Sequence, residues 1–342
     1  MSERYQGGFI TATVVNPDGN VQDSSTATGV WTLVEQFTFH KAGLWPSINA
    51  RGIFFGGNYP GASNVIDFIT INSTGNVTDF GDLTTPTSRH WANSSLTRGI
   101  MGGGLHPAPA SVPDVIEYIT ILSTGNATDF GDMQAGGYWC AGGTHNKTRS
   151  VFVEGHAGPG NNNPSNVISF VTTATTGDAS DFGDISDSGS HATGCCSPVR
   201  GVYFHGAKGN PDSAPTDTID YVTIASAGNA TDFGNARTSQ DWQGSASCSS
   251  SVRGISKNAG EMNYVTIAST GNTTDFGDPT VGNLYGSALS NNLRGIFTGG
   301  QDSNVIEFVT IATTGNAADF GDLSANRGGG FGSCANGDGG HQ

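Results

Sequence analysis

The sequence predicts an all-β protein, a closed β-propeller of six blades, and three observations support this prediction. One pattern of residues recurs six times between about position 51 and position 322. Each copy is about 41 to 53 residues long, which is the size of a four-stranded propeller blade. A further copy of the first strand of the pattern stands alone near the C-terminal end, at residues 331–337.

The composition favours strands and turns over helices, because 52 of the 342 residues are Gly and only 13% are charged. The formal net charge of −15 argues against a nucleic-acid partner, since affinity for phosphates depends mainly on Lys and Arg. Residues 1–10 lack the basic start and apolar stretch of a signal peptide, and no apolar run is long enough to span a membrane. We therefore expect a chain that is made in a cytosol and does not insert into a membrane.

The second copy of the pattern shows its parts most clearly. Residues 98–103 begin with Arg and end in Gly, which is typical of a buried strand stopped by glycine. Residues 115–122 are rich in β-branched and aromatic side chains and form a second predicted strand. The sequence Ser-Thr-Gly-Asn at 123–126 tolerates the positive φ angles of a tight turn, and 127–130 follow as a third strand. The small residues at 91–95 precede the Arg as a fourth strand, so we name the strands a, b, c and d in chain order.

Two markers fix the register of the six copies. The arginine that opens strand b is Arg51, Arg98, Arg149, Arg200, Arg253 or Arg294. The Asp-Phe pair of strand d begins at Asp79, Asp129, Asp181, Asp232, Asp275 or Asp319. Residues 51–342 are therefore assigned to the propeller, and residues 1–50, which do not match the pattern, to a small N-terminal adaptor.

Closure of the ring is expected because a row of separate sheets would expose unpaired edge strands. The segment 331–337 resembles strand a but is followed by no strand b, c or d, so it can complete the first blade, whose other strands lie at 51–82. A ring of seven blades, with extra strands from residues 5–39, is the alternative. Those residues do not match the repeat, which favours six blades.

One face of the propeller is expected to vary from blade to blade. The distance between strand c and the Asp-Phe pair is the same in all six copies, whereas the loop between strands b and c carries nearly all the variation in length. The b–c and d–a loops of an up-and-down blade emerge on one face, which we call the variable face. Recognition is usually built on loops held by a rigid scaffold, so we expect ligand-binding residues there.

Aromatic and histidine side chains supply the candidate ligand-binding residues of the variable face. These are Tyr59, Trp91, His106, Trp139, His156, His205, Trp242 and Tyr285. A ring side chain also recurs near the start of each strand a, at Trp91, Trp139, His191, Trp242, Tyr285 and Phe331. A set of flat apolar side chains around a channel mouth would suit stacking against sugars. Packing between blades would produce the same pattern, and the sequence alone slightly favours packing.

The recurring acidic motifs, such as Asp79 with Asp82, indicate a structural role rather than catalysis. A catalytic pair is normally singular, whereas six copies are typical of groups that hold blades together, through turn amides or the repeated Arg. Calcium bound by these acids is the alternative. The sequence has no HExxH or GxSxG motif, so we expect no enzyme activity, no resident metal and no cofactor. The five Cys form no CxxC pair and are expected to be small buried residues with inert thiols.

Two parts of the sequence resemble proteins of marine tailed phages. The segment TGVWTLVEQ at 28–36, followed by AGLWP at 42–46, is similar to a segment that precedes varied C-terminal modules in structural proteins of these phages. The repeated RGIF and TGNATDFGD sequences are similar to propeller modules of cyanophage proteins. The Gly-Gly ending of strand b also resembles a kelch repeat.

The resemblance implies a non-enzymatic virion structural protein, in a tail fibre or on the capsid surface, that contributes to host adhesion and is assembled in the host cytoplasm. It implies that residues 1–50 attach to other virion proteins, that the chain is present in multiple copies, and that a host-surface glycan is a partner. A purely structural decoration or filament subunit that makes protein–protein contacts is the alternative. A glycan-active propeller enzyme is the third hypothesis.

Overall fold

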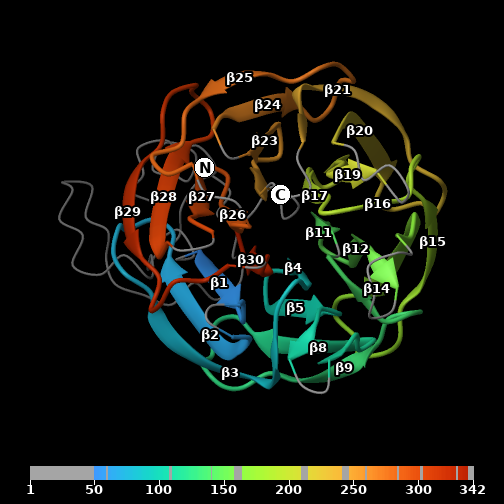
Figure 1. Cartoon of the computed structure of the whole chain (residues 1–342), viewed down its shortest axis with the longest axis vertical. Helices are drawn as coiled ribbons and strands as arrows, with labels where there is room; N and C mark the ends of the chain where they lie inside the picture. The colour runs from blue at the N-terminus through green and yellow to red at the C-terminus, as the bar shows by residue number, and fades with distance from the viewer. Residues whose placement is uncertain are drawn as a thin grey trace, which may run out of the picture. The chain divides into compact units, whose positions relative to one another are not determined.

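In the computed structural model, six four-stranded antiparallel sheets surround a central axis as the blades of a propeller (Figure 1). The structure describes residues 50–337 except for 59–60, 108–109, 140, 158–163, 209–214, 241–245, 259, 283–284, 301–302 and 329. The described residues form no helix, and hence none that is long and apolar enough to cross a membrane. The prediction of an all-β propeller with six blades is confirmed. The predicted adaptor, up to residue 49, and the extra strands of a seventh blade lie outside the described residues.

Each blade has four strands, which follow one another from the axis outward in the order a, b, c and d. Blade 1 holds β30 (Ser333–Ala335), β1 (Arg51–Phe55), β2 (Ser63–Thr70) and β3 (Thr78–Thr87). Blade 2 holds β4 (Trp91–Ser94), β5 (Arg98–Gly102), β8 (Val115–Thr120) and β9 (Thr128–Asp132). Blade 3 holds β11 (Ala141–His145), β12 (Arg149–Val153), β14 (Val167–Thr172) and β15 (Ser180–Asp184).

The other three blades repeat this order. Blade 4 holds β17 (Thr193–Cys196), β18 (Arg200–Phe204), β20 (Thr216–Thr223) and β21 (Thr231–Gln240). Blade 5 holds β22 (Ala246–Ser249), β23 (Arg253–Lys257), β24 (Met262–Thr266) and β25 (Thr274–Gly277). Blade 6 holds β26 (Ala288–Ser290), β27 (Arg294–Thr298), β28 (Val305–Thr310) and β29 (Ala318–Asp322).

The C-terminal strand closes the ring within blade 1. Strand β30 pairs antiparallel with β1, so that Ile53 faces Cys334 and Phe54 faces Ser333. The backbone N–H of Arg51 also donates a 2.8 Å hydrogen bond to Oδ1 of Asn336. The prediction that the stretch at 331–337 completes the first blade is therefore confirmed.

The hydrophobic core lies between neighbouring blades rather than within one sheet. Ile53, Phe55 and Ile66 of blade 1 pack with Met101 and Ile119 of blade 2, and all five side chains are buried. Each blade has such an apolar face on both sides, because alternate residues of a strand point to opposite faces of its sheet. Blades are therefore stable only in contact with their neighbours.

The Arg-Gly start of strand b gives room to the strand a of the preceding blade along the ring. A Cβ atom at Gly295 would lie 2.5 Å from the Sγ atom of Cys248, and one at Gly99 would lie 2.9 Å from that of Cys334. The cysteines within the described residues are buried as expected, at Cys195, Cys196, Cys248 and Cys334. Burial raises the pKa of the Cys195 thiol to about 12, which keeps it protonated and unreactive.

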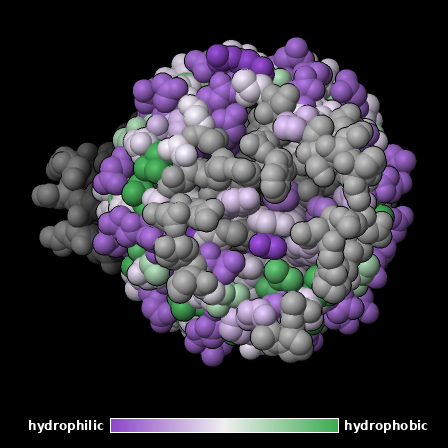
Figure 2. All heavy atoms as spheres, viewed as in Figure 1, coloured by the Kyte–Doolittle hydropathy of each residue, from purple (hydrophilic) through white to green (hydrophobic). Residues whose placement is uncertain are grey.

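The repeated c–d turn joins the outer edges of adjacent blades. The N–H of Gly125 donates to the carbonyl of Phe80 at 2.8 Å, and Oδ1 of Asn126 accepts a 3.1 Å bond from the N–H of Asp82. The same bonds recur at all six interfaces, with Asp178 in place of Asn in blade 3. This outer latch covers the d strand of every blade, which would otherwise be an exposed edge. Hydrophilic side chains surround the outer edge of the propeller (Figure 2).

The repeated arginine also joins neighbouring blades. Its hydrogen-bond acceptor is a backbone carbonyl oxygen and not a carboxylate of the repeated acidic motif. Arg98 of blade 2 donates from Nη1 to the carbonyl of Thr173 in blade 3 at 3.3 Å, and its guanidinium lies 4.6 Å from the ring of Tyr118. All six arginines bind a carbonyl of the next blade and lie over an aromatic ring of their own blade. The repeat thus encodes the contacts between blades.

Candidate functional site

The b–c and d–a loops meet on one face, as the strand order predicted. Strand β10 (Gly137–Tyr138) of a d–a loop pairs with β13 (His156–Ala157) of a b–c loop. Strand β16 (Gly189–Ser190) pairs in the same way with β19 (Ala207–Lys208), and in blade 2 Ser88 bridges Leu105. The b–c loop of blade 2 also forms its own short hairpin, β6 (His106–Pro107) with β7 (Ala110–Ser111). Backbone hydrogen bonds between these loops therefore hold part of the variable face in place.

Five residues with left-handed backbone lie around the mouth of the central channel, where the d–a loop turns into strand a in blades 1, 2, 3, 4 and 6. Gly330, Arg89, Trp139, His191 and Tyr285 have φ angles of 66°, 63°, 54°, 60° and 64°. Backbone bonds link neighbours in this ring: the Arg89 N–H donates to Gly330 at 2.7 Å, and the Trp139 N–H to Arg89 at 2.9 Å. We call these five residues the collar. Four of the five are not glycine, although this backbone region is costly for a residue with a side chain.

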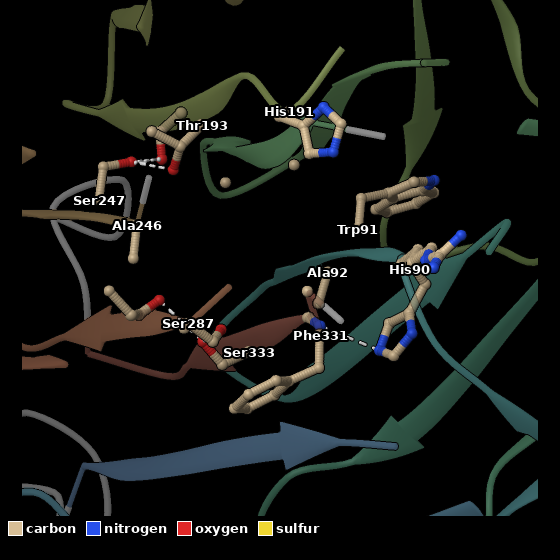
Figure 3. A pocket seen from close by; sticks show the side chains of 18 of the residues that line it. His90, Trp91, Ala92, His191, Thr193, Ala246, Ser247, Ser287, Phe331 and Ser333 are labelled. Carbon is tan, nitrogen blue, oxygen red and sulfur yellow. Dashed lines mark hydrogen bonds between the residues drawn. The ribbon is translucent and has the colours of Figure 1, made fainter. Parts of the chain in front are cut away.

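The collar borders a cavity of about 100 Å³ at the channel mouth. Collar residues line this cavity together with the first residues of the a strands, among which Thr193, Ser247, Ser287 and Ser333 bring hydroxyl groups (Figure 3). The hydroxyls of Thr193 and Ser247 are 2.7 Å apart, and the hydroxyl of Ser333 donates to the carbonyl of Ala288 at 2.8 Å. The cavity therefore combines an aromatic wall with small polar groups.

Trp139 is the centre of the aromatic wall. Its ring centroid lies 4.0 Å from that of His191 and 5.3 Å from that of Tyr285. The guanidinium carbon of Arg89 lies 4.5 Å from the Trp139 ring, within the range of a cation–π contact. The side chains of Arg89, Trp139 and Tyr285 remain partly exposed, so a ligand in the mouth can reach them.

Arg89 is the positive group of this wall. Burial lowers the pKa of Arg89 but leaves it charged at neutral pH. Burial also lowers the pKa of His90 and of His191 to about 3, so both imidazoles are neutral at pH 7. The described residues that line the cavity include no Asp or Glu. Nowhere do the described residues place three or more potential ligands together for a metal ion.

The structure separates the predicted site residues into several environments. Trp139 and Tyr285 lie together in the collar, whereas Tyr59 and Trp242 lie outside the described residues. Trp91 also borders the cavity but is only 1% exposed, because its ring stacks on Phe152 of blade 3 at 3.9 Å. Its main contacts are those of packing between blades.

The three predicted histidines do not join the collar cavity. His106 is half-buried in β6 and borders a separate cavity of about 50 Å³ beside Glu117. The ring of His156 is buried 5.6 Å from that of Tyr138, its partner in the pairing of β10 with β13. Nε2 of His205 lies 3.0 Å from Oδ2 of the buried Asp220, in the interior of blade 4.

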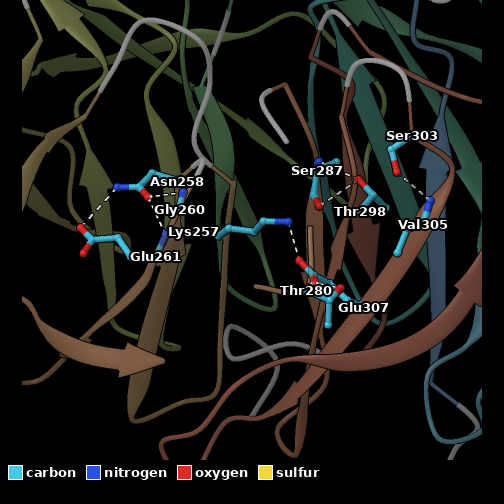
Figure 4. A network of polar contacts seen from close by, with 10 residues as sticks. All are labelled: Lys257, Asn258, Gly260, Glu261, Thr280, Ser287, Thr298, Ser303, Val305 and Glu307. Carbon is cyan, nitrogen blue, oxygen red and sulfur yellow. Dashed lines mark hydrogen bonds and ion pairs between the residues drawn. The ribbon is translucent and has the colours of Figure 1, made fainter. Parts of the chain in front are cut away.

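A second set of polar groups is buried between blades and has a structural role. Nζ of Lys257 in blade 5 lies 2.5 Å from Oε1 of Glu307 in blade 6, and Oε2 of Glu307 accepts a 2.6 Å bond from the N–H of Thr280 (Figure 4). Arg327 is paired in the same way with Asp67, at 2.6 Å. These charges are buried and satisfied by each other, so they hold adjacent blades in register.

Arg89 is a collar residue that the sequence pattern of aromatic side chains does not predict. The signal that could have found it is a distance: Arg89, Trp139, His191 and Tyr285 each stand nine residues after the Phe of the preceding Asp-Phe pair. Residue type alone selects Trp91 in blade 2 instead. If the six copies are aligned by the number of residues after this Phe, and not by aromatic residue type, Arg89 falls at the same position as Trp139, His191 and Tyr285.

The fold and the collar are the observations from which a function can be inferred. The collar joins an aromatic wall, an arginine and a set of hydroxyls around one preformed cavity. Such a combination of apolar surface with a few polar groups is typical of a small-molecule binding site. No protein-family model and no curated protein matches the sequence.

Proposed function

We propose that this chain is a non-enzymatic virion structural protein of a tailed phage, in a tail fibre or on the capsid surface, and that its propeller binds a host-surface saccharide at the collar. The observation that carries the proposal is the aromatic wall of Trp139 and Tyr285 beside a cavity with hydroxyl groups. Sugars present apolar ring faces that pack on aromatic side chains, and hydroxyls that pair with small polar groups.

Binding rather than hydrolysis is supported by the chemistry of the lining. Glycosidases generally use a pair of Asp or Glu residues that flank the bond to be cleaved. The ionisable groups among the described lining residues are instead Arg89, His90, His191 and Tyr285. Both imidazoles have pKa values lowered to about 3, far below the range of an efficient acid or base at neutral pH.

The place of the protein in a particle is supported by the sequence alone. Residues 28–46 and the repeats resemble structural proteins of marine tailed phages, in which kelch-like propeller modules follow a shared N-terminal segment. We propose that residues 1–50 attach the chain to other virion proteins, in a particle assembled in the host cytoplasm. Multiple copies on one particle would convert weak saccharide binding into firm adhesion.

A glycan array probed with the full-length chain as a multimer tests saccharide binding. The variant Trp139→Gly removes the centre of the aromatic wall, and the glycine at Gly330 indicates that the collar backbone accepts this residue. We expect about a tenfold loss of affinity, since aromatic contacts contribute about 0.5–1.5 kcal/mol each beyond the buried area. The matched control is Leu122→Ser, which alters an exposed residue of a c–d turn on the opposite face. Absence of binding to every glycan, or equal loss in the control, would refute saccharide binding.

A purely structural decoration or filament subunit is the second candidate, and one observation favours it. Val199, Val252 and Leu293 directly precede the repeated Arg in three successive blades and are 65%, 62% and 67% exposed. Exposed apolar residues gathered on one face are typical of protein–protein contacts. Solution mass measurement of the full chain, beside a variant with Ser at all three positions, distinguishes the two. Self-assembly that the variant abolishes would favour the structural role.

A further inference from the structure

Arg89 is the one positively charged side chain among the five collar residues. The other four are Gly330, Trp139, His191 and Tyr285. A residue that served the ring itself would be expected in several blades, as the arginines of strand b are. Arg89 also retains a left-handed backbone that is unfavourable for a residue with a side chain, where Gly330 shows that glycine suffices. A lone charge at this position indicates a role at the cavity rather than in the ring.

The guanidinium of Arg89 lacks the acceptor that every other described arginine has. The six arginines of strand b each bind a carbonyl oxygen, Arg237 pairs with Asp275, and Arg327 pairs with Asp67. The guanidinium of Arg89 instead lies against the rings of Trp139 and Tyr138, at 4.5 Å and 6.0 Å, and its buried Nε has no hydrogen-bond partner. Within the described residues this is a partly buried cation without an anion.

No acceptor in the described part of the chain pairs with the N–H donors of this group, which leaves them for an anionic ligand. Arginine presents its N–H donors in a planar fork that matches the two oxygens of a carboxylate. Stacking on Trp139 fixes the plane of the guanidinium, so less side-chain freedom is lost when a carboxylate binds. The lining offers no described Asp or Glu to compete for this position.

We propose that the collar binds an acidic saccharide, a sugar unit that carries a carboxylate, and that Arg89 pairs with this carboxylate. The inference rests on the proposed saccharide binding and adds its ligand class. The sugar ring lies at the aromatic wall of Trp139 and Tyr285, and its carboxylate meets Arg89 beside that wall. Neutral sugars fit the same wall but leave the cation without a partner.

The experiment measures affinity of the full-length chain for oligomers of galacturonate and of sialic acid, each beside its methyl ester. The ester keeps the sugar and removes only the charge. Wild-type protein is expected to bind the acids at least about tenfold more tightly, since hydrogen bonds to charged groups contribute about 1.5–3 kcal/mol. Arg89→Gly is expected to bind acid and ester alike, and Arg89→Lys to retain part of the preference because it keeps the charge without the fork.

The control variant is Arg237→Gln, which removes the same charge from an ion pair with Asp275 that lies about half exposed to solvent. It is expected to keep the full preference for the acids, and thermal unfolding confirms that each variant is folded. Equal affinity for acid and ester, lost together in Trp139→Gly, would overturn the acidic ligand and leave saccharide binding intact. Binding of sulfated oligosaccharides alone would also overturn it. Absence of any saccharide binding would overturn both proposals.

Discussion

His90 creates a dependence of stability on pH that one substitution can isolate. The imidazole is buried beside the collar, and burial is the main cause that lowers its pKa to about 3; the nearby charge of Arg327 lowers it further, against a hydrogen bond with Phe55. Nε2 of His90 accepts a 3.0 Å hydrogen bond from the N–H of Gly332. A proton on Nε2 would therefore face another donor in a site that excludes water.

The size of the effect follows from the difference between the folded and unfolded pKa values. In the unfolded chain the pKa of His90 returns to about 6.5. Because the pKa of His90 is lower in the folded chain than in the unfolded chain, the neutral buried imidazole contributes its full stability above about pH 6.5. This stability is lost as the pH falls from about 6.5 toward 3. Between pH 7 and pH 5 the loss is about 2 kcal/mol, and any folded pKa below about 4 gives the same figure because the unfolded state sets it.

Urea unfolding of the full chain at pH 7 and pH 5, with and without His90→Gln, measures this loss. Glutamine keeps an oxygen that can accept the Gly332 N–H but does not titrate. Glu117 and Glu154, whose pKa values are raised by burial, are present in both proteins and cancel in the comparison. Between pH 7 and pH 5, the free energy of unfolding should fall by about 2 kcal/mol more in the wild-type chain than in the variant. Equal losses would refute the assignment of a neutral, buried imidazole.

Three further predictions concern the contacts between blades. Lys257→Met should lower the free energy of unfolding by about 3–5 kcal/mol, because it leaves Glu307 buried and unpaired. Adding Glu307→Gln should recover part of this loss in urea unfolding, and strictly additive effects would contradict the pairing. Asn126→Ala should lower the free energy of unfolding by about 1 kcal/mol, because it removes a hydrogen bond of the outer latch. Asn126→Asp retains the acceptor oxygen and should lower the melting temperature less. Gly295→Ala should lower the free energy of unfolding by about 1–3 kcal/mol, because the new Cβ meets the Sγ atom of Cys248. Adding Cys248→Ala should restore part of this stability. A double variant that melts at the same temperature as Gly295→Ala alone would contradict the clash.

The blades could be predicted from the sequence because each contact between them recurs. The Arg and the turn of every copy turn out to serve the next interface, as Arg98 does for Thr173 and Asn126 for Asp82. A contact that recurs six times appears in the sequence as six copies of one motif. Aligning these copies predicts where each strand begins and ends to within a few residues. The isolated copy of strand a at 331–337 could be assigned because the alignment leaves it no blade of its own.

The collar could not be predicted in the same way, because it repeats a backbone conformation and not a residue type. Gly, Arg, Trp, His and Tyr occupy its described positions, and left-handed φ angles are not visible in such a set. Trp91 illustrates the consequence. It stands two residues after Arg89, at the start of β4, where the side chain points into the blade interface and stacks on Phe152. A shift of two residues along the chain separates the collar from the core between blades.

The position of the seam affects how fast the ring can open. Had the seam lain between two blades, packing, the outer latch and the arginine bond would have held it, and two faces could separate without breaking a sheet. Strand β30 places the seam inside blade 1, where opening breaks the pairing with β1 and uncovers Cys334 and Ala335 at the same time. Opening the ring at this seam loses both contacts together, which raises the barrier to opening there. The closing strand therefore lengthens the lifetime of the folded ring, a property separate from its equilibrium stability.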